Sequence, residues 1–363
     1  MITLFLSFFL GENSSGGSRL DSEITKPFIE SFNLCLINGL NTFIKTGQIH
    51  SPIFYYLIFS LNKFFGSNVV GLLYVAISSI IPFIFYKILV VKFNKTDKHY
   101  LFSLSMLIFL SPYFRSSACW LTNDNLALLF FCISILNFLK VKNNIQKLSI
   151  ELYLCFIFLA LSAYIRQYYG LFIIIYFLSL LKNKNYKLVF KCICLNIFLS
   201  IPFFVYLNMF YNYHGKFFNS PNPTTNNSFE NIPFVFSILI FYLSIIFFSI
   251  KNNLSLVKRL FNENLKSLII LCIFYILFLS FLDIENYIYG GGIIFKTGSI
   301  LGFGILTTLI FSFLSIIILY LILDKFIENY FIIFILILIS FELVFQKYYD
   351  PLFFILLFSL LNS

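Results

Sequence analysis

Two acidic residues, Asp21 and Glu23, follow the first apolar run of the chain, directly after a glycine- and serine-rich segment at 11–18. Acids in this position suit the start of a helix, where a carboxylate caps backbone N–H groups and interacts favourably with the helix dipole. A carboxylate at a membrane surface also suits a general base that removes a proton from an acceptor hydroxyl. The segment leaves both interpretations open.

Arginine is used sparingly, at Arg19, Arg115, Arg166 and Arg259, although the chain has 25 basic residues. A planar guanidinium binds phosphate or carboxylate in a bidentate way that lysine does not match. Arg166, with Gln167 beside it, interrupts an apolar stretch over 150–181, where a charge is costly and marks a functional site. The structural alternative is a turn between two short helices. We expect Arg166 to bind an anionic partner, with Arg115 and Lys296 as further candidates for this role.

Other polar residues lie at the edges of apolar runs. Asp124 stands near the start of such a run, as a functional residue or as a helix cap. Pro52 suits a helix start, which places the preceding residues at its entry. Lys296 follows three glycines at 290–292, which allow close approach to a ligand or form a flexible loop. The candidates for substrate binding are His50, Tyr55, Asp124, Gln167 and Tyr348.

The composition predicts an all-α, polytopic membrane protein. Hydrophobic residues make up 60% of the 363 positions and charged residues 11%, whereas soluble proteins carry about 25% charged residues. We expect one transmembrane domain over 1–363 with about 10–12 membrane-embedded helices. The net charge of +10 resides in short loops, so nucleic acid is not an expected partner. Runs of membrane length lie at 69–91, 122–139, 188–211, 232–250, 295–323 and 329–345.

Loop charge predicts the orientation of the chain. Lysine-rich connections at 87–99, 140–149, 182–191 and 251–266 alternate with connections of little net positive charge at 11–50, 113–121, 166–169, 212–231 and 283–296. The positive-inside rule places the first set in the cytoplasm and the second outside. The connection at 324–328 does not fit this alternation. The outer face then carries the longest hydrophilic segments: a first outer loop over 11–68, with interfacial helices, and a second over 212–231.

These features, in this order, resemble the GT-C class of polyprenyl-phosphate-sugar-dependent glycosyltransferases. The segment from His50 to Tyr56 (HSPIFYY) is similar to the His-Pro-Pro-Leu-Tyr-Tyr-like segment of that class, with serine in place of one proline. The Arg166–Gln167 turn and the Tyr-Tyr-Asp-Pro turn at 348–351 look most like the branch of the lumenal glucosyltransferase that completes lipid-linked N-glycan precursors, and its bacterial relatives. The resemblance spans residues 1–182, and the rest of the chain shares it only loosely. The acidic motif is Asp21-x-Glu23 instead of two adjacent acids, so either carboxylate is a candidate for the base.

The resemblance implies an inverting sugar transfer from a polyprenyl-phosphate donor to the hydroxyl of a lipid or glycan acceptor, at the outer face of a bacterial inner membrane or, alternatively, in the endoplasmic reticulum. Asp21 or Glu23 would be the base, and Arg166, Arg115 and Lys296 would bind the departing phosphate. No ligand cluster in the sequence requires a metal, no cofactor is expected, and membrane lipids are the remaining partner.

Two other functional classes are alternatives to the enzyme. A lipid-linked saccharide flippase, polymerase or transporter would carry charged or Gly/Pro-broken segments at mid-membrane in two repeated halves. No such repeat is evident, and the polar residues cluster at one face, which favours an interfacial enzyme. A structural or assembly protein would explain the spans but not the outer-face arginines.

Overall fold

The computed structural model of the chain describes residues 2–14, 17–33, 36–46, 51–142, 150–182, 184, 186–215, 228–250, 263–282, 291–323, 326–339 and 344–361. All the regular elements in these ranges are helices, so the all-α prediction is confirmed for this part of the chain. The chain forms two compact units, Met1–Pro223 and Thr224–Ser363. The expectation of one transmembrane domain over 1–363 concerns membrane insertion and stays a prediction.

The first unit contains eleven of the described α-helices and three short 3-10 turns. In chain order these are α1 (Ile2–Phe9), α2 (Ser18–Glu30), η1 (Ser31–Asn33), α3 (Leu36–Lys45), α4 (Ile53–Phe65), α5 (Ser67–Lys92), α6 (Lys98–Met106), η2 (Leu107–Leu110), α7 (Pro112–Cys119), α8 (Asn123–Lys142), α9 (Ile150–Ile165), η3 (Gln167–Phe172), α10 (Ile173–Lys182) and α11 (Tyr186–His214).

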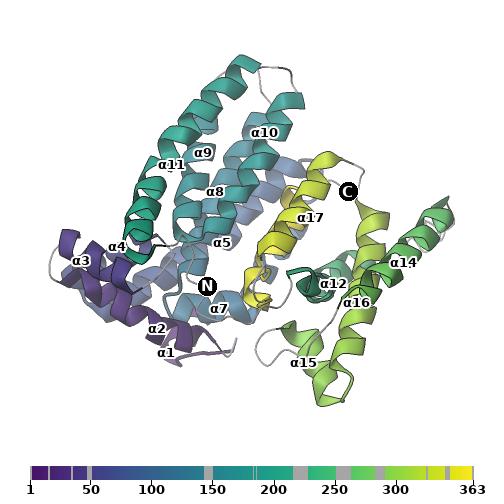
Figure 1. Cartoon of the computed structure of the whole chain (residues 1–363), viewed down its shortest axis with the longest axis horizontal. Helices are drawn as coiled ribbons and strands as arrows, with labels where there is room; N and C mark the ends of the chain where they lie inside the picture. The colour runs from purple at the N-terminus through teal and green to yellow at the C-terminus, as the bar shows by residue number, and fades with distance from the viewer. Residues whose placement is uncertain are drawn as a thin grey trace. The chain divides into compact units, whose positions relative to one another are not determined.

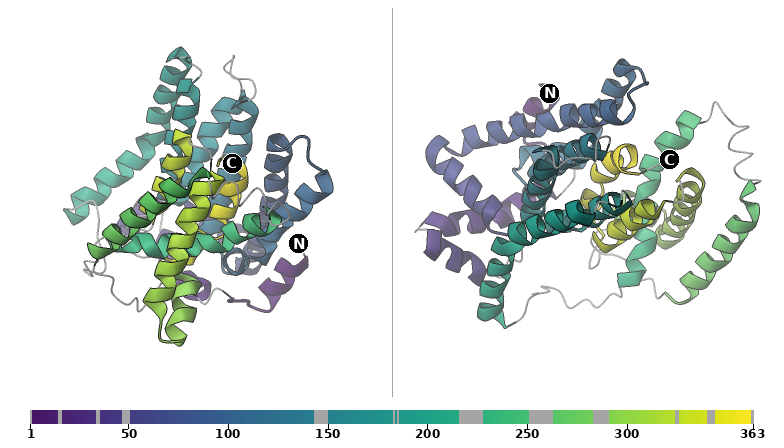
Figure 2. Two further views of the ribbon diagram at one scale, coloured as in Figure 1. Left: turned by 90° about the vertical axis from the view of Figure 1, so that its right-hand side faces the viewer. Right: turned by 90° about the horizontal axis from the view of Figure 1, so that it is seen from above.

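Short and long helices occupy different parts of the first unit. Figure 1 shows α1–α4 and α7 grouped at one end of the bundle formed by α8–α11, which extends away from them. Figure 2 gives two further views of the same ribbon. Helix α2 contacts α4 and α7, and α4 in turn contacts α5 and α9. The polar segments that surround α2, α7 and the start of α8 therefore lie together at one end of an apolar bundle.

Helix α8 lies at the centre of this bundle, against α5 and α9. Small polar side chains join the three helices, because a buried polar group must find a hydrogen-bond partner. Asn125 Nδ2 of α8 donates to Ser78 Oγ of α5 (3.2 Å), and Ser162 Oγ of α9 donates to the carbonyl of Ala127 in α8 (2.7 Å). These bonds fix the start of α8 relative to both neighbours.

Four of the described helices are long and apolar enough to cross a membrane: α5, α8, α11 and α16 (Gly304–Ile322). The predicted spans at 69–91, 122–139 and 188–211 correspond to α5, α8 and α11, and the one at 232–250 corresponds to α12 (Asn231–Ile250). Shorter apolar helices make up much of the remainder, and the total of about 10–12 membrane-embedded helices stays a prediction.

The second unit is described by itself. It contains η4 (Ser228–Glu230), α12, α14 (Leu265–Ser280), α15 (Gly292–Ile300), α16, α17 (Ile327–Ile339), η6 (Gln346–Tyr348) and α18 (Leu352–Ser359). The apolar run at 295–323 contains the spanning-length helix α16, but the chain turns between α15 and α16, so that helix begins only at Gly304. Gly302 there has φ of +79°, a conformation that glycine adopts without a steric penalty.

The glycines before α15 have a structural explanation. Gly291 and Gly292 have φ of +74° and +79°, and a Cβ on Gly292 would come within 2.6 Å of the Ile238 side chain in α12. Gln346 Oε1 accepts a hydrogen bond from the Ile293 N–H (2.9 Å), so a side chain of the same unit caps the start of α15. Close packing and helix capping therefore account for the described glycines, which the sequence left open between a ligand site and a flexible loop.

Candidate functional site

Arg166 and Asp124 form a buried ion pair in the first unit. The Arg166 side chain is 10% exposed and that of Asp124 is 15% exposed, and Arg166 Nη2 lies 2.7 Å from Asp124 Oδ1. Asp124 Oδ2 also accepts a hydrogen bond from Thr122 Oγ1 (3.2 Å). A guanidinium buried among apolar helices requires such a counter-charge, because desolvation of an isolated charge is very costly.

The end of helix α9 just before Arg166 lets this side chain reach Asp124. Helix α9 ends at Ile165, and Arg166 has extended backbone angles (φ −136°, ψ 105°) before the chain continues as η3. The Arg166 N–H still donates to the carbonyl of Ser162 (2.9 Å), so the end of α9 is capped by its own last turn. The sequence offered a turn between two short helices as the structural role of Arg166. Arg166 does lie at such a turn, and the structure adds that its partner is a carboxylate.

The start of α8, which carries Asp124, is held by a tyrosine from α5. The Tyr74 hydroxyl donates to the carbonyl of Thr122 and accepts from the N–H of Leu126. Leu121, in the turn before α8, has φ of +50°, a conformation that costs a residue of this type on the order of 1–3 kcal/mol. The surrounding bonds therefore stabilise a strained turn next to the charged pair.

Tyr55 and Asp21 belong to the same neighbourhood. Tyr55, in the first turn of α4, interacts electrostatically with Arg166, Asp124 and Asp21, in decreasing order. Its ring packs against Phe28 of α2, with ring centroids 5.8 Å apart. Asp21 lies in the first turn of α2 and is partly exposed. Helix α4 contacts α2 and α9, so helix packing brings the segments that carry Asp21, Tyr55 and Arg166 into one neighbourhood.

The environment of Glu23 differs from that of these residues. It is exposed, and its carboxylate pairs with the exposed Arg19 one turn earlier on α2 (3.2 Å). Arg19 in turn lies over the ring of Trp120, with 5.7 Å from guanidinium carbon to ring centroid. An exposed pair one helical turn apart is worth little free energy, so Glu23 is well solvated.

Arg115 has a carboxylate partner of its own. Its Nη2 lies 2.6 Å from Glu12 Oε2 and donates to Ser7 Oγ (3.1 Å). Ser14 Oγ donates to Glu12 Oε1 (2.7 Å), and Trp120 Nε1 donates to the Glu12 carbonyl (2.8 Å). Glu12, Ser14 and Trp120 received no role from the sequence; Trp120 is the single tryptophan of the chain, which is the one signal that pointed to it. The cluster fastens the segment after α1 onto α7.

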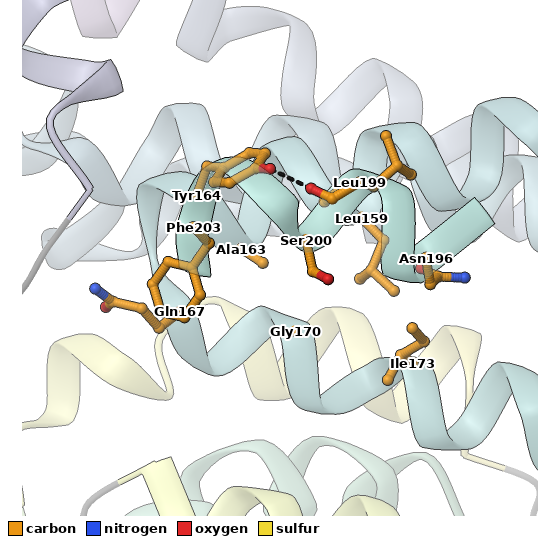
Figure 3. Close-up of a pocket in the computed structure, with 11 residues that line it drawn as sticks. Leu159, Ala163, Tyr164, Gln167, Gly170, Ile173, Asn196, Leu199, Ser200 and Phe203 are labelled. Carbon is orange, nitrogen blue, oxygen red and sulfur yellow. Dashed lines mark hydrogen bonds between the residues drawn. The ribbon is translucent and has the colours of Figure 1, made fainter. Parts of the chain in front are cut away.

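An apolar cavity begins one residue after Arg166. It has a volume of about 220 Å³ and lies between α9, η3, the start of α10 and α11 (Figure 3). Gln167 lies at one end of it and Asn196 near the other. The polar groups in its wall are engaged: Tyr164 donates to the Leu199 carbonyl, Asn196 Nδ2 to the Cys192 carbonyl (2.7 Å) and Ser200 Oγ to the Ile197 carbonyl (2.8 Å). The cavity therefore offers a hydrocarbon surface.

The remaining predicted site residues are not part of this arrangement. Lys296 is exposed on α15, and Tyr348 is half-buried in η6, where the Lys347 ammonium lies 5.8 Å from its ring centroid. Both belong to the second unit, which is described separately. His50 lies outside the described residues. Within the described ranges, no three His, Cys, Asp or Glu side chains are grouped as metal ligands would be.

No protein-family model, curated protein or solved structure matches this chain. The GT-C resemblance thus stays an expectation from the sequence motifs, and a function has to be argued from the chemistry of the site.

Removal of one partner of the buried pair is expected to destabilise the protein strongly. Asp124→Asn leaves the Arg166 charge without its carboxylate and should lower the free energy of unfolding by about 3–5 kcal/mol. The double variant Asp124→Asn with Arg166→Gln contains no buried charge and should recover most of that loss. Thermal unfolding in detergent measures both; equal stability of the single variant and the wild type would contradict the pairing.

The Glu12 cluster predicts a pH dependence of stability. Burial by itself would raise the pKa of Glu12, but hydrogen bonds from Ser7 and Ser14 and the charge of Arg115 outweigh it and hold the pKa below the ordinary value of 4.5. A carboxylate with a lowered pKa stabilises the fold above its ordinary pKa, and this stabilisation is lost as the pH falls through the lowered value. Glu12→Gln should therefore reduce stability at neutral pH by about 1–3 kcal/mol.

The measurement is the melting temperature of wild type and Glu12→Gln from neutral pH down to about pH 3. The difference between them should shrink at the acid end, where the wild-type carboxylate is also protonated. Glu23→Gln removes an exposed carboxylate and serves as the control, with no comparable change expected. A constant difference at every pH would show that the Glu12 charge is not the cause.

Proposed function

We propose that this protein is a membrane glycosyltransferase of the GT-C class, which moves a sugar from a polyprenyl phosphate to an acceptor hydroxyl with inversion at the anomeric carbon. The observation that supports this best is the buried Arg166–Asp124 pair, which lies one residue before the wall of an apolar cavity. The charges of this pair and of the partly exposed Asp21 on α2 all act on Tyr55. A lipid phosphate has the same division into an anionic head and a hydrocarbon chain. Charges inside apolar helices mark functional sites by default.

Arg166 is proposed to bind the phosphate of the donor. A guanidinium has five N–H donors in a planar fork that suits the oxygens of a phosphate. When the sugar leaves, negative charge develops on the phosphate, and a fixed guanidinium with little access to water stabilises that charge more than water would. Asp124 fixes the orientation of Arg166, so the donors are in place before the substrate arrives. Arg115 is less suited to this role, because Glu12 and Ser7 engage it.

Asp21 is proposed as the general base. Both Asp21 and Arg166 act electrostatically on Tyr55, so a base at Asp21 would lie near the phosphate site. Glu23 points to an exposed pair with Arg19 and is therefore the weaker of the two candidates left open by the sequence. The base takes the proton of the acceptor hydroxyl as that oxygen attacks the anomeric carbon.

The cavity between α9 and α11 is proposed to hold the first part of the polyprenyl chain. Its wall offers hydrocarbon, and its polar groups are hydrogen-bonded within the protein. Gln167 lies at the end of the cavity that follows Arg166 in the chain, which suits contact with the head group. Burial of each methylene contributes about 0.8 kcal/mol, so even a short part of the chain adds useful affinity.

The site is proposed to face the periplasm or a lumen. The segments that carry Asp21, Arg115 and Arg166 are connections of low positive charge between lysine-rich ones, which the positive-inside rule places outside. A bacterial inner membrane is the preferred location, with the endoplasmic reticulum as the alternative. The roles of His50, Lys296 and Tyr348 remain predictions from the sequence.

Asp21→Asn should abolish most transfer without loss of the protein. Loss of a general base lowers the rate by about 10²–10⁴-fold, whereas Glu23→Gln should stay close to wild type. The measurement is sugar transfer in membranes from cells that express each variant at equal level, with a panel of polyprenyl-phosphate sugars. Glu23→Gln is the matched control, since it removes a carboxylate two positions away on the same helix.

Three outcomes of this assay separate the interpretations. Inactivity of Glu23→Gln with an active Asp21→Asn would assign the base to Glu23. Full activity of both variants, and of the double variant at Asp124 and Arg166, would contradict this site. A wild type that transfers none of the sugars would contradict the enzyme, and a lipid-linked saccharide flippase or transporter would then be tested by transport into vesicles.

Ala163→Leu should weaken binding of long-chain donors. Ala163 lines the cavity, and its Cβ lies 3.4 Å from the place that a Cβ on Gly170 would take, so a larger side chain fills the gap between α9 and η3. Loss of one or two buried methylenes corresponds to a KM raised by about 10-fold. A donor with a short lipid should be unaffected, and an equal loss for both donors would contradict a chain-binding role.

A further inference from the structure

Tyr55 is buried in an aromatic cluster that holds its ring. The residue is 2% exposed. Its ring lies edge-on to Phe28 and Phe54, with centroids 5.8 and 5.6 Å away, and tilted against Phe43 at 5.2 Å. These contacts come from α2, α3 and α4 itself. The position of the ring is thus determined by packing and needs no hydrogen bond from the hydroxyl.

The Tyr55 hydroxyl has no hydrogen-bond partner among the described residues, which sets it apart from equally buried tyrosines. The hydroxyl of Tyr74 bonds with Thr122 and Leu126, that of Tyr176 with Ser134 Oγ (3.0 Å), and that of Tyr349 donates to the Leu336 carbonyl (2.9 Å). The Tyr55 hydroxyl is not one of the fully enclosed polar atoms that lack a partner in the described part of the chain, so the hydroxyl keeps some access although the ring is buried. A phenol that is held by its ring can donate a hydrogen bond to a ligand through such a hydroxyl.

The charges around Tyr55 indicate the chemistry of that ligand. Helix α4, which carries Tyr55, contacts α9, which ends just before Arg166, and α2, which carries Asp21. The charges of Arg166, Asp124 and Asp21 all influence the Tyr55 phenol. Burial, which outweighs these charges, raises the pKa of Tyr55 to about 12, so the phenol keeps its proton at neutral pH and acts as a donor. A donor beside a guanidinium is an arrangement that recognises an oxyanion.

We infer that the Tyr55 hydroxyl donates a hydrogen bond to a phosphate oxygen of the lipid donor, alongside Arg166, and stabilises the phosphate as it leaves the sugar. This inference rests on the proposed transfer reaction. In the reaction, the bond between the acceptor oxygen and the anomeric carbon forms while the bond from that carbon to the phosphate oxygen breaks. The electron pair goes to the phosphate and the acceptor proton to Asp21. Tyr55 retains its proton throughout, so it is a hydrogen-bond donor and not an acid.

Tyr55→Phe tests the hydroxyl alone, because phenylalanine keeps the ring contacts. Loss of a hydrogen bond to a developing charge should lower kcat by about 10- to 100-fold with a melting temperature at or above that of wild type. Tyr56→Phe is the matched control: Tyr56 is the next residue, 41% exposed, with its ring 5.5 Å from Phe32, and should stay within about twofold of wild type.

A second measurement is binding of free polyprenyl phosphate, the leaving product, to each variant in detergent. Tyr55→Phe should bind it about 10-fold more weakly than wild type or Tyr56→Phe. Normal transfer and normal product binding by Tyr55→Phe, in an assay where the wild type is active, would overturn this inference and leave the proposed function intact. A wild type that neither binds polyprenyl phosphate nor transfers a sugar would overturn both.

Discussion

The buried ion pair between Arg166 and Asp124 is the constraint that organises the first unit. A guanidinium at this depth is tolerated only with a carboxylate beside it, so the end of α9 and the start of α8 must lie at the same level. Two local features bring the charges together. Helix α9 ends at Ile165 and Arg166 has an extended backbone, and a strained turn at Leu121 precedes α8. The hydrogen bonds of Ser162 and Asn125 then fix α8 against its neighbours on both sides.

Around this pair, polar and apolar surfaces meet within a few residues. The short helices α2 and α4 carry Asp21 and Tyr55, and the cavity wall begins at Gln167, the residue after Arg166. An amphiphile with one negative charge is complementary to that boundary, whereas a fully polar solute would leave the cavity surface unused. The Glu12–Arg115 cluster uses the same residue types differently, since Ser14 and Trp120 donate hydrogen bonds to Glu12 and Ser7 accepts one from Arg115. Residue type alone therefore does not separate a ligand site from a structural fastening.

Much of the helix pattern could be predicted because apolar runs of membrane length have few alternative structures. The ends of α5, α8 and α11 lie within a few residues of the predicted spans. The turn at 301–303 could not be predicted, because Gly302 stands among apolar residues and acts through its backbone angles. Helix α2 begins at Ser18, which places Asp21 in its first turn. The pairing of Asp124 with Arg166 depends on how α8 packs on α9, and periodicity carries no information about that. Glu12 was missed because a single acid in a glycine- and serine-rich segment looks like any solvated loop residue.

Two tyrosines near the ion pair, Tyr74 and Tyr55, have different roles. The Tyr74 hydroxyl donates a hydrogen bond to the Thr122 carbonyl and accepts one from the Leu126 N–H. It thereby stabilises the first turn of α8, which carries Asp124. Tyr55 is held by its ring alone, and its hydroxyl contributes nothing to the packing that fixes it. Phenylalanine would make the same ring contacts at position 55, and the 52 phenylalanines of the chain show how readily this residue is used in its apolar core. The packing described for the ring therefore does not require a hydroxyl at this position, whereas the proposed contact with a phosphate oxygen does.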